Sequence, residues 1–259
     1  PQDQGFHEVL VHGSGGVGQT PNFFGNKYFD DTYWHNGKKE QFKGYCTDVW
    51  FDHARRFIKK STDAGKPFFC YIPTNAAHGP FLVADKYKQP YLDAGVPARR
   101  AAFYGMITNI DENVARLRKQ LAASGLADNT LLIFTSDNGA NSGDGGSSAP
   151  YTGGKGQGTQ KEGWVRVPTI FSMPGVLPKG KQYDGLVANF DFYSTIAALA
   201  GQTIPKHCDG VNLVPYLMGK RTGDAHQHLF WLNNQPDDAV RRHLIAVRRQ
   251  DWRLYKKYE

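Results

Sequence analysis

An acidic and an amide side chain, Asp137 and Asn138, directly follow the run LLIFTS, whose apolar and β-branched part covers residues 131–135. Such a run before a turn signal predicts a buried strand, and open α/β sheets bind ligands where their strands end. A carboxylate and an amide carbonyl fixed at a strand end suit a hard divalent cation such as calcium or magnesium. Two ligands do not complete a six-coordinate site, and Asp-Asn-Gly also suits a plain β-turn, so the tripeptide alone leaves both interpretations open.

A histidine and a lysine in two other loops could serve the same site. His78 lies six residues beyond PFFCYI at residues 67–72, an apolar run that predicts a second central strand. Lys155 stands in GGKGQG, within a stretch rich in Gly, Ser and Asn at residues 139–160 that we expect to be a mobile loop. With a cation, both would surround an anionic substrate with positive charge and favour phosphoryl or sulfuryl transfer, His78 protonating the leaving oxygen. A lone loop histidine is otherwise simply solvated or bonded locally.

The elements that must position these residues follow from the periodicity of the apolar side chains. Helical spacing is present at residues 47–60 and is clearest from Phe103 to Leu121. The order of strand 67–72, long helix and strand 131–135 predicts a right-handed crossover and therefore a parallel sheet. The remaining expected elements are a short strand at 6–12, a buried strand from 169, a helix at 191–199 and a strand pair at 243–248 and 252–255.

The aromatic and polar stretch at residues 22–43 predicts an irregular loop. Its acidic pair, Asp30 and Asp31, resembles a pair of metal ligands. No apolar strand precedes the pair to hold it rigidly, so a solvated loop is the preferred interpretation. Trp34 and His35 either line a pocket or pack beneath the loop.

Composition bounds the possible partners. The chain has 259 residues, a formal net charge of +7 and only three cysteines, too few for a disulfide framework. The basic balance fits an anionic small substrate, and no nucleic-acid recognition motif accompanies it, so we expect no nucleic-acid partner. No run of eighteen apolar residues occurs, so we expect no membrane span.

Six segments in a fixed order resemble one known family, the type I sulfatases of the alkaline phosphatase superfamily. They are GYCTDVWFDHARRFI, PFFCYIPTNAAHGPF, GLADNTLLIFTSDNG, GGKGQGTQKEGWVRVPTIFSMPG, NFDFYSTIAALAG and CDGVNLVPYLMG, and together they span residues 44–219. The resemblance implies an α/β fold with a mostly parallel sheet flanked by helices. It also implies a sulfatase-like domain at 1–219 that lacks its N-terminal portion, and the beginning of a small antiparallel subdomain at 220–259.

The resemblance assigns roles to the candidate residues. Asp137 and Asn138 would be two ligands of a calcium ion, with magnesium as the alternative, and His78 would contact the sulfate and assist the leaving group. Lys155 would bridge sulfate and leaving oxygen, although it stands seven residues before Glu162 where the family's lysine stands five before. Gln157 occupies the strict position, and Lys161 is the weaker substitute.

The family's nucleophile is missing from these residues. Type I sulfatases use a formylglycine made from Cys or Ser in a C/S-x-P/A-x-R motif, which none of the three cysteines begins. Ser148-Ala149-Pro150 starts correctly but lacks the arginine, and the family's early aspartate pair is also absent. We expect these parts in a segment preceding residue 1, so this chain alone would be inert. A sheet without its first strands would also expose apolar edges.

The leading hypothesis is therefore a sulfuric ester hydrolase that acts on a sulfated small molecule or glycan. A phosphate or phosphonate monoester hydrolase of the same superfamily is the second hypothesis, and a noncatalytic anion- or glycan-binding protein is the third. The resemblance suggests a periplasmic, secreted or lysosomal compartment.

Overall fold

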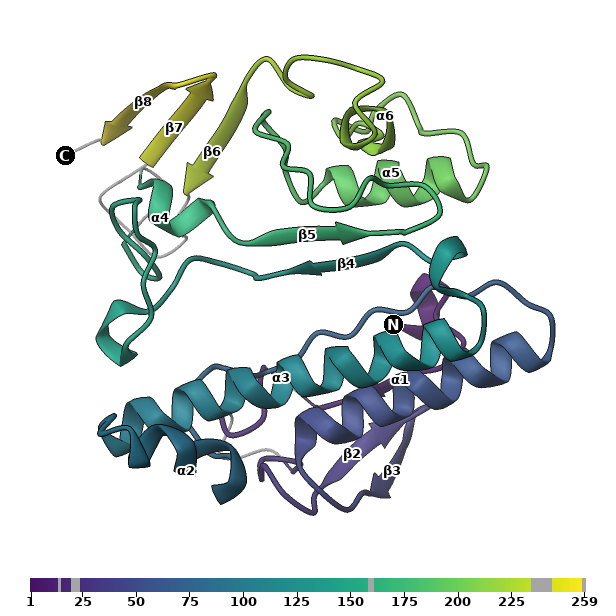
Figure 1. Cartoon of the computed structure of the whole chain (residues 1–259), viewed down its shortest axis with the longest axis vertical. Coiled ribbons are helices and arrows are strands. Elements are labelled where there is room, and N and C mark those ends of the chain that lie inside the picture. Colours follow the sequence, from purple (N-terminus) through teal and green to yellow (C-terminus); the bar gives the residue numbers. More distant parts are fainter. Residues whose placement is uncertain (14, 20–23, 158–160, 234–243, 258–259) are drawn as a thin grey trace. The chain divides into compact units, whose positions relative to one another are not determined.

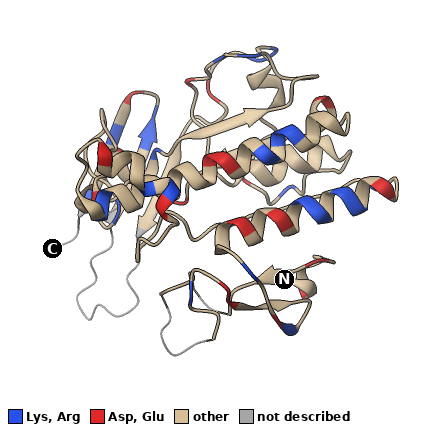
Figure 2. Cartoon of the chain, turned by 60° about the horizontal axis from the view of Figure 1, so that its bottom comes forward, with Lys and Arg blue, Asp and Glu red and all other residues tan. Residues whose placement is uncertain are grey.

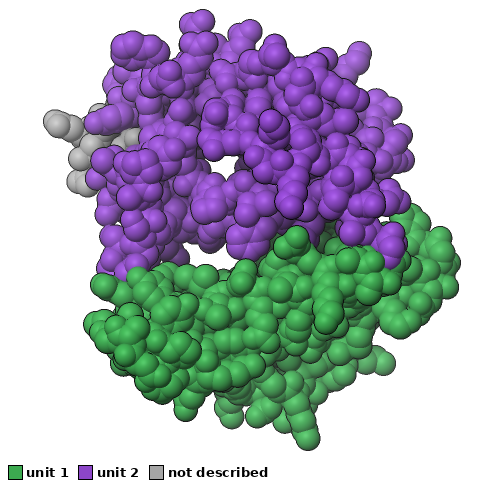
Figure 3. Space-filling model, viewed as in Figure 1, with its two compact units in different colours: residues 1–124 green, residues 125–259 purple. Residues whose placement is uncertain are grey.

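The computed structural model describes residues 1–13, 15–19, 24–157, 161–233 and 244–257. The chain forms two compact units, residues 1–124 and 125–259, coloured separately in Figure 3. Each unit is described by itself below. The division into residues 1–219 and 220–259 that the family resemblance implies stays a prediction. Among the described residues, none of the helices has both the length and the apolar composition that crossing a bilayer requires.

The first unit contains the three helices α1 (Cys46–Asp63), α2 (Asp85–Asp93) and α3 (Ala98–Ala123), preceded by a short 3-10 turn at Gln2–Gln4. Both helices predicted here from apolar spacing are confirmed as α1 and α3. Both helices carry acidic and basic positions (Figure 2), and Lys59 is bonded to Asp63 at 2.7 Å. The basic residues of α1 thus belong to a mixed, solvated face.

A buried polar seam joins α1 to α3. Asn109 and Asn113 are fully buried within α3, and their amide groups donate to Asp48 Oδ1 of α1 at 2.9 and 2.7 Å. Arg116 Nη2 donates to the same oxygen at 3.1 Å. Buried amides need such partners, because an unpaired one costs about 1–3 kcal/mol.

The first unit also contains a small antiparallel sheet, which corrects the irregular loop predicted for residues 22–43. Strands β1 (Leu10–Val11), β2 (Thr32–His35) and β3 (Lys38–Gln41) pair in that order. Asn36 and Gly37, with φ of 48° and 82°, form the two-residue turn between β2 and β3. Asn-Gly tolerates these left-handed conformations, and it is the strongest short hairpin signal in a sequence.

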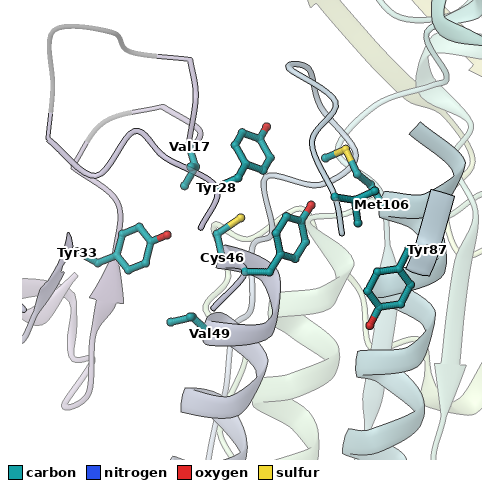
Figure 4. Packing of buried hydrophobic residues seen from close by; sticks show 9 residues of the cluster. Val17, Tyr28, Tyr33, Cys46, Val49, Tyr87 and Met106 are labelled. Atoms are coloured by element: carbon teal, nitrogen blue, oxygen red, sulfur yellow. The ribbon is translucent and has the colours of Figure 1, made fainter. Parts of the chain in front are cut away.

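The core of the first unit lies where β2 and the loop at residues 76–84 pack on helices α1, α2 and α3. Figure 4 shows Tyr28, Tyr33, Cys46 and Met106 among its members. Burial raises the pKa of the Tyr28 hydroxyl to about 12 and that of the Cys46 thiol to about 11, because the charged forms lose hydration.

The segment at residues 67–72 forms no strand, so the predicted crossover into a parallel sheet is wrong for the described residues. The segment alternates between half-buried and exposed positions, with Phe69 54% and Tyr71 69% exposed. The exposure of its side chains thus alternates with the period of two that is typical of a strand. The segment nevertheless has no strand partner in the described part of the chain. A strand needs backbone partners, which side-chain periodicity does not supply.

The second unit contains two separate sheets. Strand β4 (Leu132–Thr135) pairs antiparallel with β5 (Thr169–Ser172), and β6 (Leu229–Asn233), β7 (Leu244–Arg249) and β8 (Trp252–Lys257) form an antiparallel sheet. The predicted strands at 131–135 and from 169, and the C-terminal strand pair, are thus confirmed as strands. The burial predicted for the first two is wrong, because Phe134 is 41% and Ile170 58% exposed. Every pairing between described strands is antiparallel, in contrast to the parallel pairing expected.

The helices of the second unit are short. They are α4 (Glu162–Val165), α5 (Asp191–Leu199) and α6 (Val214–Leu217), with 3-10 turns at Ala127–Asn129 and Ser142–Asp144. The helix predicted at 191–199 is confirmed with those bounds. The mixture of helices and sheets, with a small antiparallel sheet at the C-terminus, agrees with the α/β class expected from the sequence (Figure 1).

Candidate functional site

The end of strand β4 presents Asp137 and Asn138 in a bend. Asp137 is exposed, and its Oδ1 accepts hydrogen bonds from the Asn138 backbone N–H at 2.9 Å and from Ser136 Oγ at 3.5 Å. The Gly139 N–H does not close a local turn but donates to Trp164 O at 2.8 Å. The segment therefore leaves β4 for α4, which is a different arrangement from the plain β-turn that Asp-Asn-Gly also suits.

Gly139 fixes this bend because its backbone touches α4 directly. A Cβ added to Gly139 would lie 1.7 Å from Gly163 O, closer than any real contact. Ser148 strengthens the same junction: its Oγ donates to Gly163 O at 2.9 Å and accepts from the Ala140 N–H at 3.2 Å. The position of Asp137 and Asn138 is thus set by backbone contacts that only glycine permits.

Lys155 is tied to the same junction. Its backbone N–H donates to Ala140 O at 3.0 Å, and a Cβ on the preceding Gly154 would lie 2.3 Å from that oxygen. The Lys155 side chain is exposed. The described part of the predicted mobile loop, up to residue 157, is therefore closely packed at this point.

Lys161 has a different environment. Its Nζ donates to Gln157 Oε1 at 3.4 Å, and its stem lies against Gly153, where an added Cβ would approach Lys161 Cβ to 2.6 Å. Of the two lysines considered for the sulfate-binding role, Lys155 is the one whose backbone is bonded beside the Asp-Asn segment.

A partly buried acid, Glu162, connects α4 to the C-terminal sheet. Glu162 accepts from Arg248 Nη1 of β7 and Arg253 Nη1 of β8, and its side chain is only 20% exposed. The sequence contains a signal for this acid that we did not use. Arg248 and Arg253 are directly opposite each other in the hairpin, and like charges so placed need an anion between them.

His78 lies in the first unit, in a loop held to α1. Its backbone N–H donates to Asn75 O at 2.9 Å, and Tyr28 Oη donates to His78 O at 3.2 Å. Asn75 Oδ1 accepts in turn from Cys46 Sγ and Trp50 Nε1, both at 3.5 Å. The local contacts of its neighbours thus fix the loop, while the imidazole of His78 stays exposed.

The orientation of the His78 ring defines which nitrogen is available. Nδ1 lies 2.9 Å from Gly79 O, and because a carbonyl only accepts, Nδ1 carries the proton of the neutral ring. Nε2 is then the nitrogen that can accept or deliver a proton during a reaction.

The second unit thus brings together three of the four predicted residues, Asp137, Asn138 and Lys155, by way of Gly139 and Ala140. His78 belongs to the first unit and is described there. In the part of the chain that the structure describes, the one cluster of three or more His, Cys, Asp or Glu ligand atoms lies elsewhere, at Glu8, His35 and His53. Asp137 and Asn138 fit two positions of a hard-cation site, and no such cluster adds further carboxylates to them.

The mixture of helices and sheets, with a small antiparallel sheet at the C-terminus, is consistent with a domain of the alkaline phosphatase-like class. Sequence comparison makes this specific. The family profile described as Sulfatase matches residues 2–202, and the one described as N-sulphoglucosamine sulphohydrolase, C-terminal, matches residues 160–259. The chain belongs to the sulfatase family, which confirms the resemblance to type I sulfatases.

Curated relatives agree with this membership. The chain is 31% identical over 242 residues to the Uncharacterized sulfatase YdeN of Escherichia coli strain K12, covering 90% of this chain and 40% of that protein. It is 32% identical over 184 residues to the N-acetylgalactosamine-6-sulfatase of Canis lupus familiaris, covering 69% of this chain and 34% of that protein. The chain therefore spans about two fifths or less of the length of these relatives.

Solved structures show the same likeness in three dimensions. The crystal structure of Ps i-CgsB in complex with k-i-k-neocarrahexaose has a TM-score of 0.84 and 27% sequence identity, covering all of this chain and 60% of that one. A phosphonate monoester hydrolase of Agrobacterium radiobacter has a TM-score of 0.62 at 22% identity over 83% of this chain and 54% of that one, a likeness of fold alone.

Proposed function

We propose that the protein containing this chain hydrolyses sulfate esters, and that this chain supplies the groups that hold the sulfate and serve its leaving oxygen. The observation that carries the proposal is the junction at Gly139 and Ala140, which bonds the Asp137–Asn138 segment and Lys155 to one another within a chain of the sulfatase family. Cations and hydrogen-bond donors accelerate such a reaction mainly by stabilising the negative charge that develops on the oxygens in the transition state.

Calcium is the proposed cofactor, with Asp137 and Asn138 as two of its oxygen ligands and magnesium as the alternative. When bound, such an ion supplies positive charge to the oxygens of the sulfate group. The backbone bond from Asn138 N–H to Asp137 Oδ1 orients that carboxylate. The Gly139 contact with Gly163 holds both ligands to α4, so little reorganisation is needed when they bind.

The remaining roles fall to a lysine and a histidine. Lys155 has an exposed ammonium group suited to binding the sulfate and the leaving oxygen. His78, with Nδ1 facing Gly79 O, holds a proton on Nε2 in its charged form and delivers it to the leaving oxygen as the ester bond breaks. The formylglycine nucleophile is not made from these 259 residues, since none of the three cysteines begins the required motif.

A sulfated glycan is the proposed substrate class. Support comes from relatives whose names or titles state carbohydrate substrates or ligands, namely the N-acetylgalactosamine-6-sulfatase and the neocarrahexaose complex. The fold likeness to a phosphonate monoester hydrolase keeps phosphate or phosphonate esters as the second candidate. A noncatalytic anion- or glycan-binding protein is the third.

Hydrolysis assays on the full-length protein separate these candidates. We expect turnover of p-nitrophenyl sulfate, and of a sulfated oligosaccharide, to exceed that of p-nitrophenyl phosphate, and removal of calcium by a chelator to abolish it. Faster phosphate turnover would favour the second candidate. Binding of the sulfated oligosaccharide without any turnover would favour the third.

A matched pair of lysine variants tests the site itself. Lys155→Ala should lower kcat/KM by roughly 100-fold to 1,000-fold, the usual effect of removing one transition-state donor. Lys161→Ala, in the same loop but bonded to Gln157, should change it by less than about threefold. The reverse pattern would assign the role to Lys161.

A further inference from the structure

Three metal-ligating side chains converge in the first unit, outside the proposed catalytic residues. They come from three segments: Glu8 precedes β1, His35 ends β2, and His53 lies in α1. Glu8 Oε1 lies 2.7 Å from His35 Nε2 and 2.9 Å from His53 Nε2. All three ligand atoms lie within 4.8 Å of one another.

Neighbouring groups orient each member of this cluster. Glu8 Oε2 accepts from Asn36 Nδ2 at 3.3 Å, so Oε1 is directed at the two rings. His35 Nδ1 lies 2.5 Å from Glu40 Oε2, which fixes that ring through its other nitrogen. The two imidazoles meet edge to face, with centroids 4.9 Å apart.

The bond from His35 to Glu40 is the arrangement found around metal-ligating histidines. Such a histidine almost always donates its second ring N–H to a carboxylate or carbonyl, which fixes the tautomer and makes the free nitrogen a better ligand. His35 has that partner at Nδ1, and its Nε2 faces Glu8, whose Oε1 also contacts His53 Nε2. The cluster thus has both its ligand atoms and an outer partner in place.

Exposure is consistent with a site that an ion can enter. The side chains of Glu8, His35 and His53 are 24%, 27% and 15% exposed, so the cluster is partly desolvated and still reached by solvent. Two imidazole nitrogens and one carboxylate oxygen are the ligand set of zinc sites that keep a fourth position open.

We propose that Glu8, His35 and His53 bind one divalent transition-metal ion of the zinc class. Ligands about 2.0–2.1 Å from a tetrahedral ion lie about 3.3 Å from each other. The two nitrogen–oxygen separations of 2.7 and 2.9 Å therefore need to widen by only about half an ångström, which small side-chain rotations provide.

Metal binding exchanges protons for the ion. Because a carboxylate only accepts, both histidines carry a proton on Nε2 when they are bonded to Glu8. The ion takes both Nε2 lone pairs and Glu8 Oε1. His35 releases its Nε2 proton to solvent and keeps the Nδ1 proton toward Glu40, while His53 carries its proton on Nδ1 instead.

This site is distinct from the proposed calcium site and does not depend on the proposed hydrolysis. The calcium ligands are hard oxygens of the second unit, whereas imidazole suits zinc, cobalt, nickel and copper ions. An ion here would connect the segment before β1, the end of β2 and helix α1, so its expected role is to stabilise the fold of the first unit.

Titration of the full-length protein with Co²⁺, in saturating calcium and without an affinity tag, tests the proposal. We expect one equivalent of Co²⁺ to give the intense visible absorption of a four- or five-coordinate site, and one equivalent of Zn²⁺ to abolish it. Zn²⁺ should also raise Tm in the same calcium buffer. Six-coordinate oxygen sites give only weak absorption, so residual binding at the calcium ligands is distinguishable.

Three variants locate the site. His53→Ala and the isosteric Glu8→Gln should each weaken Co²⁺ binding at least tenfold, in line with the loss of a ligand. His7→Ala removes an exposed histidine next to Glu8 and should leave binding unchanged. Circular dichroism of each variant without metal checks that it is folded.

The proposal is overturned if Co²⁺ gives no intense absorption at one equivalent. It is equally overturned if folded Glu8→Gln and His53→Ala proteins bind Co²⁺ as tightly as the unaltered protein does. In either case the cluster serves only as a hydrogen-bonded link between β2 and α1.

Discussion

The two units are stabilised by different means. Most of the buried hydrophobic residues belong to the first unit, where tyrosines, Cys46 and Met106 form one cluster. In the second unit the buried hydrophobic residues among those described are few: Met173, Leu186, Leu213, Leu229 and Ala246. Each unit has three fully buried polar side chains among the described residues, namely Thr47, Asn109 and Asn113 in the first and Asp191, Ser194 and Thr195 in the second. Polar contacts therefore make up a larger share of the buried interior of the second unit.

This difference explains where each unit should be vulnerable. An apolar core tolerates apolar substitutions of similar volume, because its stability is the sum of many weak contacts and no single one is essential. A buried carboxylate or a glycine against a carbonyl has no substitute of similar shape and chemistry. The second unit, which carries Asp137, Asn138 and Lys155, should therefore respond sharply to single changes far from those residues.

The largest effect is expected for Asp191→Ala. Asp191 is fully buried, and it accepts from the N–H groups of Ala188 and Val211 at 2.8 and 2.9 Å and from His226 Nε2 at 2.8 Å. Its removal leaves three donors unpaired and should cost roughly 3–5 kcal/mol of unfolding free energy. Denaturant unfolding measures this cost, with the exposed Asp251→Ala as the control expected within about 0.5 kcal/mol. Equal effects of the two variants would show that the buried carboxylate of Asp191 does not stabilise the second unit.

Gly139→Ala should follow, at about 3 kcal/mol. Its new Cβ would lie 1.7 Å from Gly163 O, and both partners are backbone, so the Asp-Asn segment must move away from α4. Gly143→Ala in the same loop is the matched control, since its Cβ would come no closer than 3.4 Å to Asn141 Oδ1. Thermal unfolding and hydrolysis assays on both variants make the test. Unchanged activity in Gly139→Ala would show that the junction does not position the site.

Much of the fold was predictable because helix formation depends on residues that lie close together in the sequence. The apolar spacing identified α1 and α3, α5 was predicted with its observed bounds, and β4 ended at the predicted strand end before Asp137. The pairing of strands was not predictable in the same way. The run at 67–72 has strand composition and the strand period, but pairing depends on segments distant in sequence, and its expected partner β4 pairs with β5 instead.

One hairpin signal was present in the sequence and went unused. Asn36-Gly37 marked the β2–β3 hairpin within a stretch that otherwise looked irregular, and so it placed His35 at the end of a strand. The buried asparagines of α3 gave no such signal, since their role depends on Asp48 of another helix. For the candidate site, the residue types were visible in the sequence, whereas the contact of Gly139 with Gly163 depends on tertiary structure.

The smallest expected effect is a difference in alkylation rate between Cys46 and Cys70. It compares the core of the first unit, which contains Cys46, with the segment at 67–72, which contains Cys70. Burial raises the pKa of both the Cys46 and the Cys70 thiol to about 11, above the ordinary value of 9.0. A raised pKa leaves the neutral thiol dominant below it, so at pH 8 each thiolate is about 100-fold scarcer than in the unfolded chain, and alkylation by iodoacetamide slows accordingly.

The two thiols should respond differently when the pH is raised from 8 to 10. Cys70 is half-buried, so its alkylation rate should rise about tenfold per pH unit as the thiolate forms. Cys46 is fully buried in the core, and its rate should instead stay limited by local opening of the structure. Mass spectrometry of the alkylated peptides measures both rates, with the protein in urea as the reference. Parallel pH profiles for the two residues would show that the core around Cys46 opens as readily as the unpaired segment at 67–72.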